Sequence, residues 1–281
     1  MLDDVLGYLR CPVCGAALAR AGGAVRCPAG HSFDVARQGY LSLLPPGPAR
    51  TAGDTAAMVR ARGEFLGAGH FSGLAAAVAA AAAACAGEAG CVVDVGAGTG
   101  YYLAAVLGRL PRHVGLALDA SRYALRLAAR AHPRAGAAGC DAWRPLPVAD
   151  GAVDLVLNVF APRDGGELRR ILRPAGHLLV VTAAAGHLGE LTGPLGLLRV
   201  DERKRDRLAA KLGPHFDVVR EREHREVLAL DHAAVTDLAM MGPSAWHADP
   251  GDLAARARRL PEPVSVTLAV TLSLYRPNRE R

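Results

Sequence analysis

The chain has 281 residues, of which 51% are hydrophobic, so it is long and apolar enough for one large domain and one small one. No apolar run has the length of a membrane span, and the acidic start Met1-Leu2-Asp3-Asp4 lacks the basic and apolar segments of a signal peptide. We therefore expect a cytoplasmic protein without a membrane anchor. The net charge of +6 suits a polyanionic partner, but the basic residues are nearly all arginine, and a chain rich in arginine, alanine and glycine is also typical of a GC-rich genome.

Three of the six cysteines lie close together near the N-terminus, with a histidine beside them. Cys11 and Cys14 form a C-x2-C pair, and after twelve residues Cys27 and His31 form a C-x3-H pair. Two such turns can complete the tetrahedral shell of three thiolates and one imidazole that is typical of structural zinc, and the alternative is two reduced pairs without metal. The other three cysteines are expected to be small buried side chains in a reducing compartment: Cys85, Cys91 and Cys140.

Around and after these ligands the chain has clear turn signals. The segment Ala16 to Arg26 predicts a short hairpin that turns at Gly22-Gly23. The run Pro45-Pro46-Gly47-Pro48 indicates a linker, and we place the domain boundary there. Gly53-Asp54-Thr55 can then cap the first helix of the main domain.

The main domain continues with a strand, a glycine-rich turn and a helix. Cys91 to Val95 is a short β-branched run, Gly96 to Gly100 contains three glycines, and Tyr101 to Leu110 has a helical pattern. This order opens a nucleotide-binding α/β unit, because glycines let the backbone approach a ligand. A second strand, His113 to Leu118, ends in Asp119, about where an acid would meet ribose hydroxyls.

The turn has the pattern D-x-G-x-G-x-G, with Asp94 at its start, rather than the G-x-G-x-x-G of dinucleotide enzymes. It resembles motif I of class I methyltransferases, which use S-adenosylmethionine (AdoMet). Three later segments agree: a third strand ends at Asp141, where these enzymes hold adenine, Val153 to Asn158 is a buried fourth strand, and Leu172 to Val181 is their proline–glycine–strand passage. The resemblance implies an α/β, class I Rossmann-like fold with a small N-terminal zinc-binding module.

A narrower resemblance covers essentially the whole chain. It rests on the zinc ligands and on these segments: His31-Ser32-Phe33-Asp34, Gly39-Tyr40-Leu41, Gly53-Asp54-Thr55 with Met58, Ala61 and Arg62, Ala68-Gly69-His70-Phe71, and Met241-Gly242-Pro243-Ser244-Ala245-Trp246. Together they resemble the bacterial 23S rRNA (guanine-N1) methyltransferases, a family that includes the housekeeping RlmA enzymes and the TlrB type found with macrolide producers.

The resemblance implies methyl transfer from AdoMet to N1 of a guanine in a 23S rRNA hairpin loop near the peptide exit tunnel. Methylation there would hinder macrolides, giving tylosin-type resistance. Residues 1–45 would be a zinc-binding RNA-recognition module, and residues 46–281 the AdoMet-dependent methyltransferase domain. The enzyme would act as a homodimer. Which of two neighbouring guanines is chosen, and whether the role is housekeeping or resistance, stay open.

The cofactor pocket is predicted from motif positions and from the family resemblance. The family resemblance adds His187, which lies just after the fifth strand, and Phe71. Other family members can carry Tyr at the position of Phe71 and Glu at the position of Thr99. The predicted AdoMet contacts are Phe71, Asp94, Gly96, Gly98, Thr99, Gly100, Asp119, Asp141 and His187.

No general base stands out. Guanine N1 must be positioned against the methyl and must lose its proton as it attacks. Asn158 and His187 follow the carboxyl ends of strands, and Trp246 could stack on an extruded base, so these three are the candidates. Each could instead be structural: a turn residue, an exposed loop histidine or a core aromatic. Candidates for phosphate contacts in the zinc module are Arg10, Arg20, Arg26 and Arg37.

Two alternatives from other classes remain at this stage. One is a methyltransferase of a small molecule, against which the zinc module argues. The other is a non-catalytic RNA-binding adaptor, against which the intact glycine-rich turn and Asp119 argue.

Overall fold

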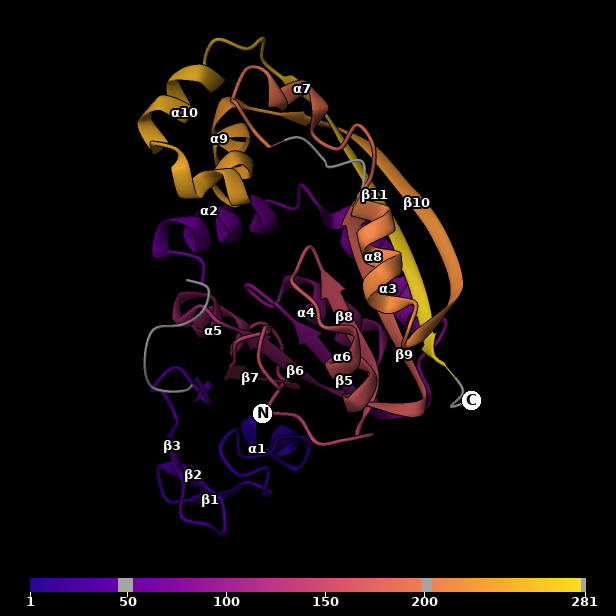
Figure 1. Ribbon diagram of the computed structural model, residues 1–281. Coiled ribbons are helices and arrows are strands. Elements are labelled where there is room, and N and C mark those ends of the chain that lie inside the picture. The colour runs from indigo at the N-terminus through magenta and orange to yellow at the C-terminus, as the bar shows by residue number, and fades with distance from the viewer. Residues whose placement is uncertain (45–52, 199–203, 279–281) are drawn as a thin grey trace.

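A central sheet of parallel strands carries the main domain. The computed structural model describes residues 1–44, 53–198 and 204–278, and within them eight strands pair in the order β10-β11-β9-β8-β5-β6-β7-β4 (Figure 1). Strands β4 to β9 run parallel, and β11 is antiparallel to both of its neighbours, β9 and β10. The strands are β4 (Leu41–Ser42), β5 (Gly90–Val95), β6 (His113–Asp119), β7 (Ala135–Gly139), β8 (Val153–Val159), β9 (Leu172–Ala183), β10 (Phe216–Leu230) and β11 (Val264–Pro277).

The predicted class I Rossmann-like fold is confirmed, including its opening unit. β5 ends at Val95, residues 96–100 turn, and helix α4 (Tyr101–Arg109) follows directly. The chain then adds β6 and β7 on one side of β5 and places β8 and β9 on the other. In open sheets of this kind, ligands bind outside the carboxyl ends of the strands where the order reverses, here between β5 and β8.

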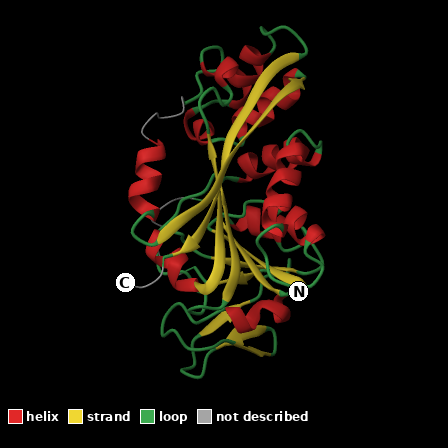
Figure 2. Cartoon of the chain, turned by 90° about the vertical axis from the view of Figure 1, so that its right-hand side faces the viewer, coloured by secondary structure: helices red, strands yellow, loops and turns green. Residues whose placement is uncertain are grey.

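The two faces of the sheet pack into two apolar clusters. Adjacent side chains of a strand point to opposite faces, so Val92 and Val93 belong to different clusters although both are fully buried. One face is covered by α3 (Ser72–Ala83), α4 and α5 (Arg122–Ala128). The other is covered by α1 (Leu2–Val5), α6 (Gly165–Ile171) and α8 (Lys204–Leu212), so Figure 2 shows helices on both sides of the strands.

A group of helices lies beyond the carboxyl ends of β5 and β8 (Figure 1). α2 (Ala56–Gly67) packs against α9 (His232–Met240), which is followed by the 3-10 helix η2 (Pro243–His247) and α10 (Pro250–Ala257). Thr55 caps α2 as predicted, since its side chain accepts a hydrogen bond from the backbone N–H of Met58 at 3.2 Å. These helices and the short α7 (Gly189–Thr192) lie over the region where the fold binds ligands.

The N-terminal lobe joins the main sheet instead of standing apart from it. The predicted hairpin is confirmed: β1 (Ala19–Ala21) pairs with β2 (Ala24–Arg26) across Gly22-Gly23, and β3 (Ser32–Asp34) extends it. β4 pairs with β7 of the main sheet, and Leu9 and Leu41 are buried in the same cluster as residues of β5 and β6. The predicted linker at 45–48 lies outside the described residues, so the boundary at 45/46 stays a prediction.

One membrane-related finding concerns the described helices. None of them is by itself long and apolar enough to cross a bilayer, and α2 and α3 meet the criteria of length and composition only together, as a pair bent by 84°.

Candidate cofactor pocket and zinc centre

The four predicted zinc ligands meet at one point of the N-terminal lobe. The nearest separations are 3.3 Å from Cys27 Sγ to His31 Nδ1, 3.6 Å from Cys11 Sγ to His31 Nδ1, and 3.6 Å from Cys14 Sγ to Cys27 Sγ. A tetrahedron with metal bonds of about 2.0–2.3 Å has edges of about 3.3–3.8 Å, so the four atoms already have the spacing of a zinc shell. All four positions are protein atoms within 4.8 Å of one another, as a structural site requires.

The arginines of this lobe differ in their surroundings. Arg10 pairs with Asp150 at 2.7 Å and Arg20 pairs with Asp3 at 2.7 Å, so each shares its charge with a carboxylate. Arg26 donates to the hydroxyl of Ser32 at 3.2 Å, and Arg37 is exposed. Of the four candidates for phosphate contacts, Arg26 and Arg37 are the better placed.

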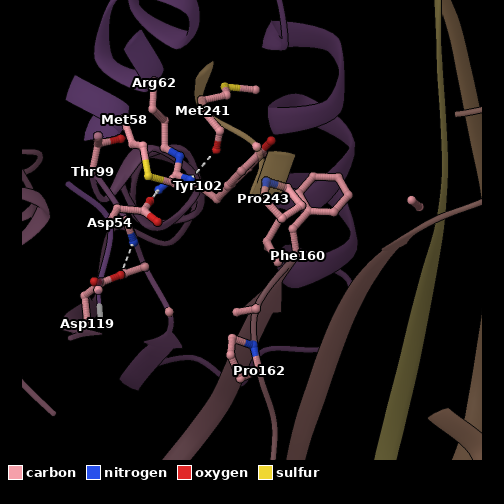
Figure 3. Close-up of a pocket in the computed structure, with 18 of the residues that line it drawn as sticks. Asp54, Met58, Arg62, Thr99, Tyr102, Asp119, Phe160, Pro162, Met241 and Pro243 are labelled. Carbon is pink, nitrogen blue, oxygen red and sulfur yellow. Dashed lines mark hydrogen bonds and ion pairs between the residues drawn. The ribbon is translucent and has the colours of Figure 1, made fainter. Parts of the chain in front are cut away.

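A pocket of about 790 Å³ opens at the carboxyl ends of β5, β6 and β8, beneath α2 and α9 (Figure 3). Its size is within the usual range for small-molecule sites. Seven of the nine predicted cofactor residues line it: Phe71, Asp94, Gly96, Gly98, Thr99, Asp119 and His187.

The other two predicted contacts lie beside the pocket. Gly100 directly precedes α4 with a φ of 80°, and a Cβ there would lie 2.9 Å from the Cβ of Ala131. A glycine at this position therefore lets the start of α4 pack closely against the residues that follow α5. The buried Asp141 accepts the backbone N–H of Trp143 at 3.0 Å, while Trp143 itself lines the pocket. Asp141 therefore holds the turn that places Trp143 in the wall of the pocket.

The glycine-rich turn follows the floor of the pocket. Gly98 has a φ of 54°, and its N–H donates to Asp119 at 2.8 Å, which ties the turn to the end of β6. A Cβ at Gly96 would lie 2.4 Å from that of Ala161, so the turn and the loop after β8 approach as closely as glycine allows.

Two carboxylates, the buried Asp94 and the half-buried Asp119, dominate the electrostatics of the pocket. Burial, with the neighbouring Asp119 charge, raises the pKa of Asp94 to about 8, and its Oδ1 has no hydrogen-bond partner among the described residues. Burial also raises the pKa of Asp119, whose oxygens accept N–H groups of Gly98 and Ser121 at 2.8 Å each. Such a site favours a ligand that brings positive charge and hydroxyl donors, as AdoMet does with its ammonium, sulfonium and ribose.

Three of the aromatic side chains that line the pocket are exposed, each by 42–43%: Trp143, Phe160 and Trp246. Phe160 follows β8 with a left-handed φ of 53°, and its ring centroid lies 5.8 Å from that of His187. Trp246 was a candidate from the sequence, whereas Trp143 and Phe160 were not, although each closely follows the end of a strand, where an aromatic residue is a usable signal.

The three catalytic candidates have different positions. His187 and Trp246 line the pocket, and the Nδ1 atom of His187 accepts the N–H of Ala269 at 3.3 Å. Asn158 does not line it. Its side chain is fully buried, donates to the carbonyls of Val95 and Pro162 at 3.3 and 2.9 Å, and accepts from Arg163 at 2.6 Å. These bonds engage both ends of the amide, so Asn158 holds β5 and the loop after β8 together.

Comparison with known proteins identifies the family. A protein of Micromonospora griseorubida assigned as a 23S rRNA (guanine-N1) methyltransferase is 55% identical over 99% of this chain and 100% of its own length. The 23S rRNA (guanine(748)-N(1))-methyltransferase of Streptomyces fradiae is 51% identical over 99% of each chain. The chain belongs to the 23S rRNA (guanine-N1) methyltransferase family. A Bacillus subtilis protein assigned to the same activity is 31% identical over 85% of this chain and 87% of its own.

Two family models match this chain, one in the N-terminal lobe and one in the main domain. Residues 9–48 match the zinc ribbon described as "RlmA, N-terminal", and residues 93–180 match a methyltransferase domain. These matches, with the ligand cluster, confirm a methyltransferase that uses AdoMet and carries structural zinc. The individual AdoMet contacts stay predictions.

The zinc centre can be tested by metal content. The protein purified without chelators should hold about one zinc per chain. Cys14→Ala should lose it, because three ligands bind zinc far more weakly than four, while S-adenosylhomocysteine still binds in the main-domain pocket. Cys85→Ala, a cysteine outside the cluster, should keep its zinc. Elemental analysis that finds no zinc in the unaltered protein, or full zinc in Cys14→Ala, would contradict the assignment.

The charge of the pocket predicts a pH dependence of cofactor binding. The ammonium of S-adenosylhomocysteine should favour ionised Asp94, which is largely protonated below its pKa of about 8 in the free protein. Binding then releases a proton, so affinity should rise between about pH 6 and pH 8, by up to about tenfold per unit. In Asp94→Asn this rise should disappear, whereas Asp217→Asn on the distant β10 should retain it. Calorimetry that shows equal, pH-independent affinity in all three proteins would mean that Asp94 does not face the cofactor.

Proposed function

We propose that this protein transfers the methyl group of AdoMet to N1 of a guanine in 23S rRNA, and that the guanine is the one at position 748. The observation that carries the proposal is the 51% identity to the Streptomyces fradiae guanine-748 enzyme over 99% of both chains, which includes the zinc lobe as well as the pocket. A small-molecule methyltransferase would share the pocket without needing the lobe.

The residues around the pocket suit a base substrate. AdoMet, when bound, supplies an electrophilic methyl group. A guanine flipped out of a loop needs flat apolar surfaces, and Trp143, Phe160 and Trp246 offer them beside the cofactor residues. Stacking would hold the plane of the base and so bring N1 into line with the methyl group.

The proton of N1 must leave during transfer, and His187 is poorly suited to take it. A neutral imidazole whose Nδ1 accepts a hydrogen bond carries its proton on Nε2, so its other nitrogen acts as a donor. This geometry supports a role for His187 in holding cofactor or base. The N1 proton would then pass to water, and no side chain is named as its acceptor.

Several finer features belong to the same proposal. The substrate would be the hairpin loop near the peptide exit tunnel, met by a homodimer in the cytoplasm, with Arg26 and Arg37 of the zinc lobe near the phosphates. The methyl group would hinder tylosin-type macrolides. The net charge of +6 supports a polyanionic substrate.

Primer extension on cellular RNA tests the proposal. N1 lies on the Watson–Crick edge of guanine, so its methyl group should stop reverse transcriptase beside position 748 when the gene is expressed in a strain that lacks this modification. The same cells should tolerate more of a tylosin-type macrolide. Gly98→Trp, which fills the turn, and Cys14→Ala should remove the stop, and Asp217→Asn should retain it. RNA without a stop, from cells that contain folded and cofactor-binding protein, would overturn the assignment of the substrate.

A further inference from the structure

An arginine that no cofactor motif includes lies inside the pocket. Arg62 of α2 is 24% exposed, and its Nη1 forms an ion pair with Asp54. Its Nη2 donates to the backbone carbonyl of Met241 at 2.7 Å. Figure 3 shows the guanidinium reaching from α2 toward the pocket, between Asp54 and Met241.

The guanidinium lies directly against the glycine-rich turn. A Cβ placed on Gly98 would be 3.2 Å from Arg62 Nη1 and 3.5 Å from its Cδ. The N–H of Gly98 is held by Asp119 at 2.8 Å, and the hydroxyl of Ser121 donates to the carbonyl of Asp54 at 2.6 Å. The turn, the end of β6 and the segment before α2 therefore surround one positive charge.

Arg62 retains donors for a ligand. A guanidinium has five N–H groups, and the two bonds to Asp54 and Met241 are those it makes within the part of the chain that the structure describes. Both bonds also fix its orientation, so little side-chain freedom would be lost when a further acceptor binds. Arg163, another arginine of the pocket, donates to Asn158 and to the carbonyl of Ala161 in the loop after β8.

The charges of the cofactor match this arrangement. AdoMet carries one anionic group, the carboxylate of its methionyl end, beside an ammonium group. Asp94 and Asp119 suit the cationic and hydroxyl groups but would repel the carboxylate, which needs a cation close to them. A planar guanidinium is well suited to a carboxylate, because two parallel N–H groups match its two oxygens.

We infer that Arg62 binds the methionyl carboxylate of AdoMet, and that Asp54 and the Met241 carbonyl position the guanidinium for it. The inference rests on the AdoMet-dependent part of the proposed function and not on the RNA substrate. Because Met241 directly precedes the loop that leads to Trp246 on η2, the same guanidinium also connects the cofactor to one wall of the base site.

Calorimetry with a pair of ligands tests the inference on the full-length protein. S-Adenosylhomocysteine and its decarboxylated counterpart differ only in the carboxylate. The unaltered protein should bind the decarboxylated ligand about 10- to 100-fold more weakly, the usual contribution of a hydrogen-bonded charge pair. In Arg62→Ala, S-adenosylhomocysteine should weaken by a similar factor while the decarboxylated ligand changes by less than about threefold. Arg60→Ala, which removes an arginine that is 73% exposed on the same helix, should change neither affinity.

The outcomes separate a binding role from a structural one. If Arg62→Ala lowers the affinity for both ligands equally, Arg62 stabilises the fold and does not bind the carboxylate, and the inference is overturned. Unchanged affinity for both ligands would overturn it as well. If Arg62→Ala does not melt cooperatively, Arg62→Lys provides the same comparison, because it keeps the charge but loses the paired donors, and it should weaken only S-adenosylhomocysteine. Failure of the unaltered protein to bind S-adenosylhomocysteine would contradict AdoMet use itself.

Discussion

The pocket depends on two neighbouring carboxylates, the buried Asp94 and the half-buried Asp119. Asp94 and Asp119 lie at the ends of paired strands, where a charge away from water is costly unless it is compensated. Asp119 is compensated by the backbone N–H groups of Gly98 in the turn and of Ser121 after β6, whereas Asp94 retains an oxygen without a partner in the described chain. A cationic ligand would favour the ionised form of Asp94, which favours AdoMet over a neutral or anionic nucleotide.

The zinc lobe is stabilised in two ways, by its metal ligands and by contacts with the main domain. A lobe this small buries too little apolar surface to be stable by itself, and a four-ligand metal shell replaces part of the missing core. The rest comes from the main domain: Val25 and Leu41 are fully buried in a cluster shared with its sheet, and β4 extends that sheet. These contacts hold the lobe in a fixed place relative to the pocket. A lobe that orients a large substrate needs such a fixed position.

Local patterns predicted much of this molecule, and contacts across the chain account for what they missed. The strand, turn and helix around Gly98 and the C-x2-C and C-x3-H pairs are short-range signals, so their positions could be predicted closely. Asn158 was a catalytic candidate because it lies at the carboxyl end of a strand, but Arg163 and two carbonyls engage its side chain in the interior. Arg62 belonged to the segments that carry the family resemblance, but nothing in the sequence placed it at the cofactor, since its carbonyl partner lies 179 residues away. Whether a polar side chain serves the fold or the ligand is decided by such partners, which lie 4 and 5 residues from Asn158 as well as far along the chain.

The central claim, a base methyltransferase that requires RNA, is tested most directly by following the methyl group itself. Purified protein would be incubated with AdoMet labelled in the methyl group and, separately, with protein-free 23S rRNA, with ribosomes lacking the modification, and with a small-molecule extract. We predict label in RNA, recovered after nuclease digestion as 1-methylguanosine, and none in the extract. Label in a small molecule, or none in any fraction from protein that binds S-adenosylhomocysteine, would contradict the account.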